Sequence, residues 1–298
     1  MAAQVVYSAV AGHGFRHHAP VANSASGDSV LTRAVRILGA FEPERPTLNV
    51  SEIAARAHLP VATAHRLVTE LVRLGLLERT GTRGLRVGAR LWELGVRSNR
   101  IPGLREAALP FMEDLHAVVR QHVSLSVLVG SEVLYIERLS SPGAVPNISA
   151  IGRRLPLHCC SAGIVLLAHA PAQVQEQALT GPLAAFTPRT VTDPGRLRQM
   201  VAGVRRRGYC VAPEQVDLGV KGLAAPLQDR TGAVVAALSV VTPLTQDHRA
   251  LIPALKAAAR GIARAMGGEG LGAHEVVRER SEFDITPTAD IPGTGRRT

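Results

Sequence analysis

Two adjacent thiols beside an imidazole are the residues of this chain best placed for covalent chemistry. His158, Cys159 and Cys160 follow one another in the segment LPLHCCSAG. A histidine that activates a neighbouring cysteine is a common arrangement in hydrolases. Consecutive side chains of an extended segment point to opposite faces, however, so His158 and Cys159 cannot form such a pair. We therefore expect small buried thiols that line a pocket, and we keep a small-molecule-binding enzyme, such as a hydrolase, as the alternative hypothesis.

The remaining motifs do not support metal or nucleotide chemistry. The histidines of GHGFRHH, near the N-terminus, could bind a transition metal, but a segment without regular structure offers no fixed ligand geometry. HEVVR at residues 274–278 lacks the second histidine of a zinc-protease helix, and GGEGLG follows an expected helix instead of a strand. We expect no metal site, no cofactor and no catalytic residue.

A basic amphipathic segment offers a different chemistry, the binding of a polyanion. It is HLPVATAHRLVTELVRLGLLER, residues 58–79. At helical spacing its apolar residues form one face, made of Ala64, Leu67, Val68, Leu71 and Leu74. Away from that face lie Thr63, Arg66, Glu70 and Arg73. One side of this helix is therefore expected to pack into a core, while the other stays free to contact a partner.

Two further helices are expected before this segment. Asp28 or Ser29 can cap the first, whose apolar positions are Val30, Leu31, Ala34, Leu38 and Phe41. A loop, PERPTLN, follows. Asn49 and Glu52 then form a capping box that opens a short helix ending near Ala57.

The order of the elements predicts a winged helix-turn-helix. Pro60 is acceptable at the start of the long helix, which runs to about Leu74 and is stopped by Gly75. The segments LLERT and RGLRVG then face each other across GT as a hairpin. In a winged helix-turn-helix the second helix enters the major groove of DNA and the hairpin rests on the backbone. The alternative is a three-helix bundle without a ligand.

A second block of mixed helices and strands follows. A helix is expected from about Leu104 to Gln121, and strands are expected at HVSLSVLVG, EVLYIERL and VVAALSVV. Helical stretches lie at SAGIVLLAHA, PGRLRQMVAGVRRRG and HRALIPALKAAARGIARAM. This order predicts an α+β domain with a mainly antiparallel sheet. Residues 1–27 and the Gly- and Pro-containing C-terminal end show no sustained period and are expected to be unstructured.

Composition and charge agree with a two-domain protein that contacts nucleic acid. The chain has 298 residues, 46% of them hydrophobic, which is enough for two cores. Its net charge is +10, and residues 28–100 carry 12 arginines against 7 acids, which predicts a polyanionic partner, nucleic acid first and an anionic membrane second, although charge alone does not choose between them. No apolar run spans a bilayer, no signal peptide is recognisable, and three cysteines give no disulfide framework. We expect a soluble, cytoplasmic protein.

The chain resembles the IclR family of transcriptional regulators over residues 29–266, in collinear order. SVLTRAVRILGAF, LNVSEIAARAHLPVATAHRLVTELVRLGLLER and GLRVGARLWELG are similar to that family's N-terminal domain. LPLHCCSAGIVLLA and RRGYCVAPEQVDLGVKGLAAPLQDRTGAVVAALSVVTP are similar to the two signature segments of its effector-binding domain. The resemblance implies a winged helix-turn-helix at 28–95, a linker helix region at 96–121 and a GAF-like mixed α/β domain at 104–267, between a flexible extension at 1–27 and a tail at 268–298.

The resemblance also implies a function and partners. We expect a repressor without catalytic activity that binds double-stranded operator DNA as a homodimer or homotetramer and responds to a small organic effector. The family often has Lys and Ser where Val61 and Ala62 stand here, so one phosphate contact and one hydroxyl are missing. The residues expected to bind DNA are Thr63, His65, Arg66, Arg73, Arg79, Arg83 and Arg86.

The effector pocket is expected to depart from the family pattern in polarity. The residues implied to line it are Leu155, Ser161, Ala162, Ala212, Gly222, Ser239 and Val241. Among them, Ala212, Gly222 and Val241 stand where relatives can offer polar groups, and Gly163-Ile164 replaces the usual Gly-Lys. A buried ligand charge without partners is costly. We therefore expect an aromatic or otherwise largely apolar acid, ester or lactone instead of a compact polar acid, with any anionic end held by the two serine hydroxyls and by backbone amides after Leu157.

Overall fold

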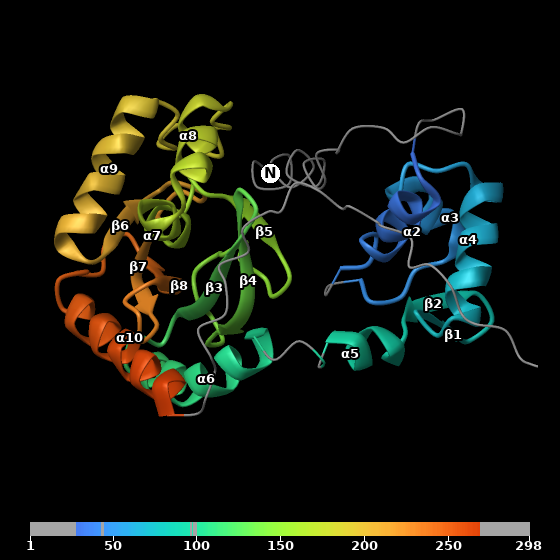
Figure 1. Cartoon of the computed structure of the whole chain (residues 1–298), viewed down its shortest axis with the longest axis horizontal. Coiled ribbons are helices and arrows are strands. Elements are labelled where there is room, and N and C mark those ends of the chain that lie inside the picture. The colour runs from blue at the N-terminus through green and yellow to red at the C-terminus, as the bar shows by residue number, and fades with distance from the viewer. Residues whose placement is uncertain (1–27, 43–44, 96, 98–99, 269–298) are drawn as a thin grey trace, which may run out of the picture.

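The computed structural model describes residues 28–42, 45–95, 97 and 100–268. Figure 1 shows a smaller N-terminal unit of helices with a hairpin and a larger C-terminal unit built on a sheet. The two histidine-containing segments GHGFRHH and HEVVR lie outside the described residues, as do the N-terminal extension and all of the expected C-terminal tail except its first residue, which ends the last helix.

The N-terminal unit has the predicted element order. Helices α2 (Val30–Leu38), α3 (Val50–Arg56) and α4 (Val61–Arg73) precede strands β1 (Leu77–Thr80) and β2 (Gly84–Val87), which pair antiparallel. The end signals are those expected. Ser29 caps α2, the Asn49–Glu52 capping box has both of its hydrogen bonds, and Gly75 leaves α4 with a φ of 73°. The predicted winged helix-turn-helix architecture is therefore present.

The core of this unit differs from the prediction at its edges. The fully buried residue of α2 is Ile37, which the predicted apolar set omitted, whereas Leu31 is 77% exposed. Phe41 lies beyond the helix, because α2 ends at Leu38. Leu74 is exposed because it is the C-cap of α4, and the core continues instead through the buried Leu77 of β1. The sequence pattern placed the face correctly within α4 but not at its last position.

Helix α5 (Ala89–Gly95) was not predicted and buries none of its side chains within the described part of the chain. Trp92, the single tryptophan of the sequence, is 71% exposed. Exposed apolar side chains also occur nearby in the sequence at Val87 and Leu94. This short helix therefore presents apolar surface that the described part of the chain does not cover.

The C-terminal unit is built on a six-stranded, fully antiparallel sheet with the order β5-β4-β3-β8-β7-β6. The strands are β3 (His122–Val129), β4 (Glu132–Leu139), β5 (Arg154–Pro156), β6 (Cys210–Pro213), β7 (Val220–Gln228) and β8 (Val234–Pro243). The antiparallel α+β prediction is confirmed. Three of these strands, β5, β6 and β7, were not predicted.

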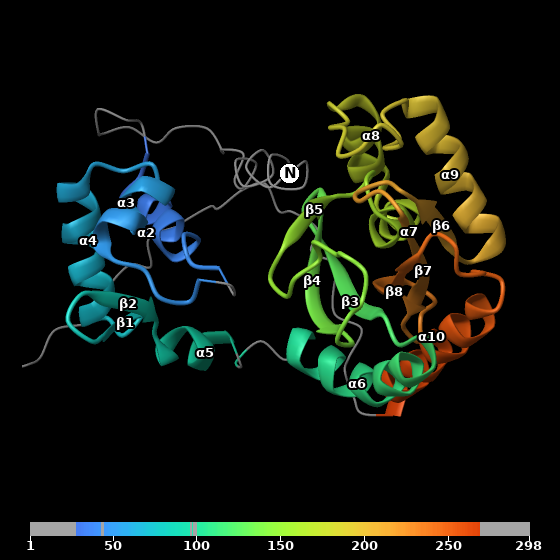
Figure 2. The same cartoon turned by 180° about the vertical axis from the view of Figure 1, so that it is seen from behind.

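Helices cover both faces of this sheet (Figure 2). Helices α6 (Arg100–Val119) and α10 (Leu251–Gly268) pack on one face, around a core that includes Met112, Leu125 and Leu255. The other face carries α7 (Ser161–His169), α8 (Ala172–Thr180) and α9 (Pro194–Arg207), around a second core that includes Leu157 and Ile164. Helix α6 starts four residues before the predicted Leu104 and contains Pro110.

Candidate functional site

The first candidate site is the outward face of α4. Its opposite face is buried through Ala64, Leu67, Val68 and Leu71, so this packing turns His65 and Arg66 toward solvent. Thr63, one turn before Leu67, is partly exposed. The turn before α4 is tight, because His58 takes a left-handed φ of 52° and the Leu59 amide donates to the Ala54 carbonyl at 2.9 Å.

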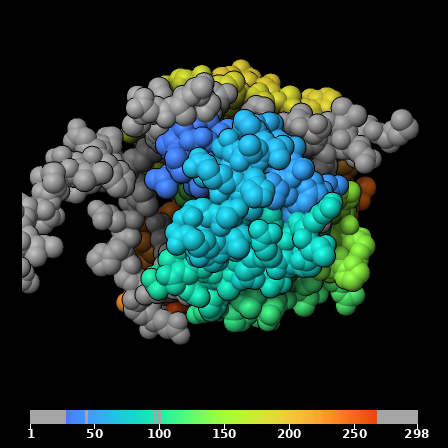
Figure 3. Space-filling model, turned by 90° about the vertical axis from the view of Figure 1, so that its right-hand side faces the viewer, coloured from blue at the N-terminus to red at the C-terminus, as the bar shows by residue number. Residues whose placement is uncertain are grey.

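The hairpin is fixed relative to this helix. Leu85 of β2 exchanges two backbone hydrogen bonds, of 2.8 and 2.9 Å, with Leu48 of the loop before α3. Both leucines are buried in the core that also holds α4. Arg79 and Arg83 are exposed near the tip of the hairpin. Figure 3 looks onto this unit, whose residues form one continuous surface.

The five arginines expected to bind DNA fall into two groups. Arg73 donates to both carboxylate oxygens of Glu70, at 3.0 and 2.5 Å, and Arg86 donates to Glu78 at 2.9 and 3.1 Å. The hydrogen bonds from Arg73 lower the pKa of Glu70. The pKa of Glu78 is lowered by a hydrogen bond from the Ala89 backbone amide and by those from Arg86. Of these five, Arg66, Arg79 and Arg83 have guanidinium groups that form neither an ion pair nor a hydrogen bond within the described residues.

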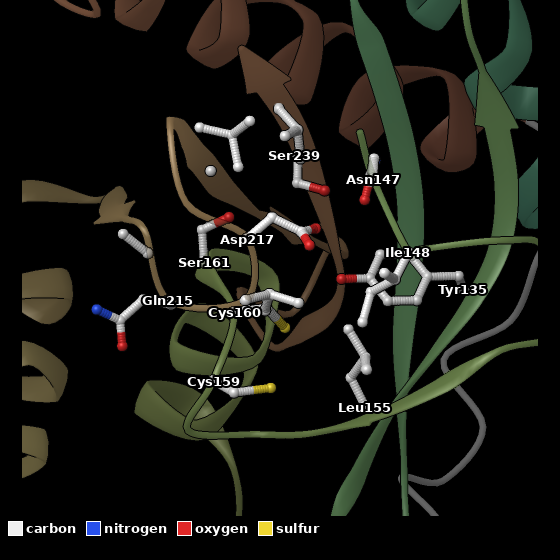
Figure 4. A pocket seen from close by; sticks show the side chains of 15 residues that line it. Tyr135, Asn147, Ile148, Leu155, Cys159, Cys160, Ser161, Gln215, Asp217 and Ser239 are labelled. Atoms are coloured by element: carbon white, nitrogen blue, oxygen red, sulfur yellow. The ribbon is translucent and has the colours of Figure 1, made fainter. Parts of the chain in front are cut away.

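The second candidate site is a small cavity in the C-terminal unit, with a volume of about 50 Å³. Figure 4 shows its side chains. The residues that line it are Tyr135, Asn147, Ile148, Leu155, Cys159, Cys160, Ser161, Ala212, Gln215, Val216, Asp217, Val220, Gly222, Ser239 and Val241.

Two glycines allow α7 to approach the sheet and so shape this cavity. A Cβ atom on Gly163 would lie 2.3 Å from the Leu157 carbonyl oxygen, so only glycine permits the first turn of α7 to contact that backbone. A Cβ atom on Gly222 of β7 would lie 2.7 Å from the Ser161 hydroxyl. Ser161 and the preceding Cys160 are thereby held at the cavity wall.

The thiols are structural parts of this wall. Cys160 is the N-cap of α7 and accepts the Gly163 amide at 3.4 Å. The adjacent Cys159 side chain lowers the pKa of Cys160, and the Tyr135 hydroxyl and backbone amides act in the same direction. Backbone amides that were expected to hold an anionic ligand are thus partly occupied by sulfur.

No catalytic pair forms between histidine and cysteine here. The His158 ring donates from Nε2 to the Ala184 carbonyl at 2.9 Å, and burial lowers its pKa. The Cys159 thiol donates instead to the Pro156 carbonyl at 3.2 Å. The expectation of small buried thiols lining a pocket is confirmed. Within the described residues, no group of three potential metal-binding side chains occurs, and none of the helices is both long and apolar enough to cross a membrane.

Six of the seven residues expected at the effector pocket meet at this one cavity; they are Leu155, Ser161, Ala212, Gly222, Ser239 and Val241. Ala162 does not line it, because its side chain points into the core around α7, where it is 1% exposed. Sequence reasoning missed Tyr135, the loop residues Asn147 and Ile148, the segment 215–217 and Val220. The segment 215–217 and Val220 carried a signal, since they lie inside a signature segment, and 215–217 contains two polar residues.

Polar groups of the cavity differ in how they are bonded. Gln215 is fully engaged, accepting the Val191 amide at 2.8 Å and donating to the Arg189 and Pro213 carbonyls. Ser239 donates only a long bond of 3.4 Å, to the Ser124 carbonyl. Its hydroxyl therefore remains available to a ligand.

Two family models match the chain. The IclR helix-turn-helix domain matches residues 30–81, and the C-terminal domain of the bacterial transcriptional regulator IclR matches residues 100–266. The two matches correspond to the two units of the fold.

Individual relatives cover most of the chain. A solved IclR homolog from Microbacterium hydrocarbonoxydans, complexed with 4-hydroxybenzoate, is 43% identical, covers 80% of this chain and 100% of its own, and has a TM-score of 0.76. The glycerol operon regulatory protein of Streptomyces coelicolor is 32% identical over 82% of this chain and 96% of its own. The HTH-type transcriptional repressor AllR of Escherichia coli is 30% identical, with coverages of 77% and 86%.

Proposed function

The chain belongs to the IclR family of transcriptional regulators, and from that assignment we propose that it is a repressor whose release from its operator is controlled by an aromatic compound. The family assignment makes it a DNA-binding regulator with an effector-binding C-terminal domain and leaves the hydrolase alternative without support. The proposed domains are residues 28–95 for DNA binding, 96–121 as linker and 104–267 for the effector.

We propose that α4 reads the major groove and the hairpin contacts phosphate. The supporting observation is that the unpaired guanidinium of Arg66 lies on the outward face of α4, while those of Arg79 and Arg83 lie on the hairpin beside it. Thr63 and His65 add a hydroxyl and an imidazole to the same surface. Arg73 and Arg86 would have to exchange their carboxylate partners for phosphate, which exposed ion pairs allow at little cost.

Assembly follows from the same geometry. A palindromic operator needs two reading helices about 34 Å apart, or a multiple of that spacing, which one chain cannot supply. We propose a homodimer or homotetramer. The uncovered apolar side chains of α2 and α5, among them Leu31 and Trp92, support an interface between copies.

The proposed effector is an aromatic acid or a closely related aromatic compound. The observation that carries this proposal is the cavity itself, whose walls combine apolar side chains, such as Leu155 and Val241, with a few hydroxyl and amide groups. A relative with 43% identity was solved with 4-hydroxybenzoate, which has the same combination of a ring and polar ends.

A selection experiment tests the proposed function. The full-length protein would be used to select duplexes from a random double-stranded DNA pool, and the selected sites would be footprinted. We expect an inverted repeat protected at two half-sites. Recovery of no preferred sequence at moderate salt would contradict an operator-binding role.

A further inference from the structure

Two unpaired polar groups of opposite character line the cavity. The Asp217 carboxylate forms no hydrogen bond or ion pair within the described part of the chain, and the Asn147 Nδ2 group is buried without an acceptor there. Buried polar groups in native proteins nearly always have partners, and the Asn147 Nδ2 group is an exception. The half-exposed Asp217 carboxylate in the same cavity wall is unpaired as well, so one ligand can supply a partner to each.

The orientation of the Asn147 amide is set by its neighbours. Its Oδ1 atom accepts the Ser149 backbone amide at 3.0 Å and the Ser149 hydroxyl at 2.8 Å. Because a backbone amide can only donate, the atom that receives it must be the oxygen, and the unpaired atom is the nitrogen. Arg138 holds the same loop by donating to the Asn147 and Ser149 carbonyls. Asn147 is therefore a fixed, unused donor.

Asp217 is an unused acceptor on an equally supported loop. Two residues before it, Gln215 is held by three hydrogen bonds to backbone groups. Lys221, four residues further along the chain, does not neutralise Asp217, because its ammonium group donates to the Leu244 carbonyl at 2.8 Å and forms no ion pair within the described residues. In Figure 4 the carboxylate of Asp217 points into the cavity. Burial without a cation raises its pKa.

We propose that Asp217 and Asn147 determine effector specificity, Asp217 by accepting a hydrogen bond from a hydroxyl on the aromatic ring and Asn147 by donating to a carboxylate or carbonyl of the same ligand. The inference rests on the proposed function, in which an aromatic compound occupies this cavity. A carboxylate can accept but not donate, so a ligand that places an ether or a second carboxylate against Asp217 leaves both groups without a proton to share. The selected class is therefore the hydroxylated aromatic acids and their neutral amides.

Calorimetry with three ligands tests the role of Asp217. The ligands are 4-hydroxybenzoate, benzoate and 4-methoxybenzoate. At ring position 4 the first carries a hydroxyl group, the second only hydrogen and the third a methoxy group, which has no proton to donate. We expect the wild type to bind 4-hydroxybenzoate at least about tenfold more tightly than the other two, because a site built for a hydroxyl rejects analogues that lack it. In Asp217→Asn this preference should fall to within about threefold. The matched control Asp114→Asn, an exposed carboxylate on α6 outside the cavity, should keep the wild-type preference.

A second variant tests Asn147 without removing its structural bonds. Asn147→Asp keeps an oxygen for Ser149 but replaces the donor by an acceptor. We expect this variant to bind 4-hydroxybenzoate at least about tenfold more weakly than the wild type does. The affinity for the neutral 4-hydroxybenzamide should fall less, because only the acid places a negative charge against the new carboxylate. Thermal unfolding and DNA binding of both variants would show that they are folded.

The outcomes separate this inference from the proposed function. If the wild type binds all three benzoates equally, or if Asp217→Asn keeps the preference for the hydroxyl, the specificity assignment is overturned while an aromatic effector stands. If Asn147→Asp lowers the affinities for 4-hydroxybenzoate and for 4-hydroxybenzamide equally, the role proposed for that side chain is overturned. If none of the aromatic compounds binds the folded wild type, the effector class falls and the specificity assignment falls with it.

Discussion

Tyr135 and Glu137 stand two positions apart on β4 but face opposite sides of the sheet. Regular strand alternation would put them on one face. Here Tyr135 pairs with Ser126 and Glu137 with Leu125, so Ile136 is an extra residue, a β-bulge that reverses the alternation. Tyr135 consequently lines the cavity, whereas Glu137 bonds Arg105 of α6, at 3.0 and 2.5 Å.

This bulge connects the cavity wall to α6 through the bond between Glu137 and Arg105. A ligand that displaces Tyr135 acts on β4. Two residues further along β4, Glu137 is bonded to α6, the helix that follows the N-terminal unit in the chain. We expect Glu137→Gln to reduce the coupling between effector and DNA affinities by about 0.5–2 kcal/mol, because the charged anchor is lost. DNA anisotropy with and without 4-hydroxybenzoate measures this.

The control for this coupling is a second arginine–glutamate pair on the same strand. Arg154 and Glu132 join β5 to β4 at 3.4 Å, and no hydrogen bond or ion pair within the described residues links either of them to α6. Glu132→Gln should leave the coupling unchanged. Equal effects of the two variants, or none from Glu137→Gln, would contradict a route through α6.

Two arginines should separate base reading from phosphate contact. Arg66→Ala is expected to weaken operator binding by about 1–3 kcal/mol, with altered specificity if the contact is to a base edge. Arg83→Ala should weaken binding to all DNA sequences evenly. It should also lower the slope of log affinity against log salt concentration by about one unit. Arg73→Ala should cost less than Arg66→Ala, because Glu70 holds its guanidinium. Anisotropy at several salt concentrations measures all three, and unchanged binding in both Arg66→Ala and Arg83→Ala would overturn the assignment of this surface.

Bulk at Gly222 should close the cavity. Even a Cβ atom there would meet the Ser161 hydroxyl at 2.7 Å, and a leucine side chain would extend into the ligand space. We expect Gly222→Leu to abolish calorimetric binding of 4-hydroxybenzoate while DNA affinity stays within about twofold, since the DNA surface lies in the other unit. Undiminished ligand binding by the folded variant would show that the ligand binds elsewhere.

The hydroxyl of Ser239 should contribute less than the cavity shape. Its present bond to the Ser124 carbonyl is long, so little is lost when the hydroxyl turns to a ligand. Ser239→Ala is expected to weaken the effector by about 0.5–1.5 kcal/mol if the hydroxyl meets a neutral group and by about 1.5–3 kcal/mol if it meets a charged one. Calorimetry decides between them, and an unchanged affinity would exclude a ligand contact at this serine.

Trp92 is a native reporter of assembly because it is the single tryptophan and lies exposed on α5. If α5 packs against a second copy, dilution should shift its fluorescence emission to longer wavelength, as the indole becomes hydrated. Light scattering on the same samples should give a mass of two or four chains at micromolar concentration. A single-chain mass with solvent-exposed tryptophan at every concentration would contradict the proposed assembly.

Much of the DNA-binding unit could be predicted because its signals are local. The capping box at Asn49 and the glycine stop of α4 act within a few residues, and the apolar face of α4 is set by helical spacing. Strand β7 was missed because VKGLAAPLQ is buried on both faces and so shows no alternation, while glycine, alanine and proline disfavour a strand.

The cavity was only partly predictable, for a different reason. Tyr135 reaches it because a bulge changes the phase of its strand, and Asn147 and Asp217 reach it from loops that tertiary packing brings together. The spacing of residues in the sequence does not indicate that these three side chains lie at one cavity. Of the two polar groups that carry the specificity proposal, Asn147 had no signal in the sequence, whereas Asp217 lies in a signature segment but is placed at the cavity only by tertiary packing.

The central claim, that one ligand and one DNA site are coupled through this chain, is tested most directly by reciprocal titration. The dissociation constant of a selected duplex would be measured by anisotropy without and with saturating 4-hydroxybenzoate, and that of the ligand by calorimetry without and with saturating duplex. We expect each partner to weaken binding of the other by the same factor, about 5- to 150-fold for typical coupling energies of about 1–3 kcal/mol. Tight binding of both partners with neither changing the affinity of the other would contradict it.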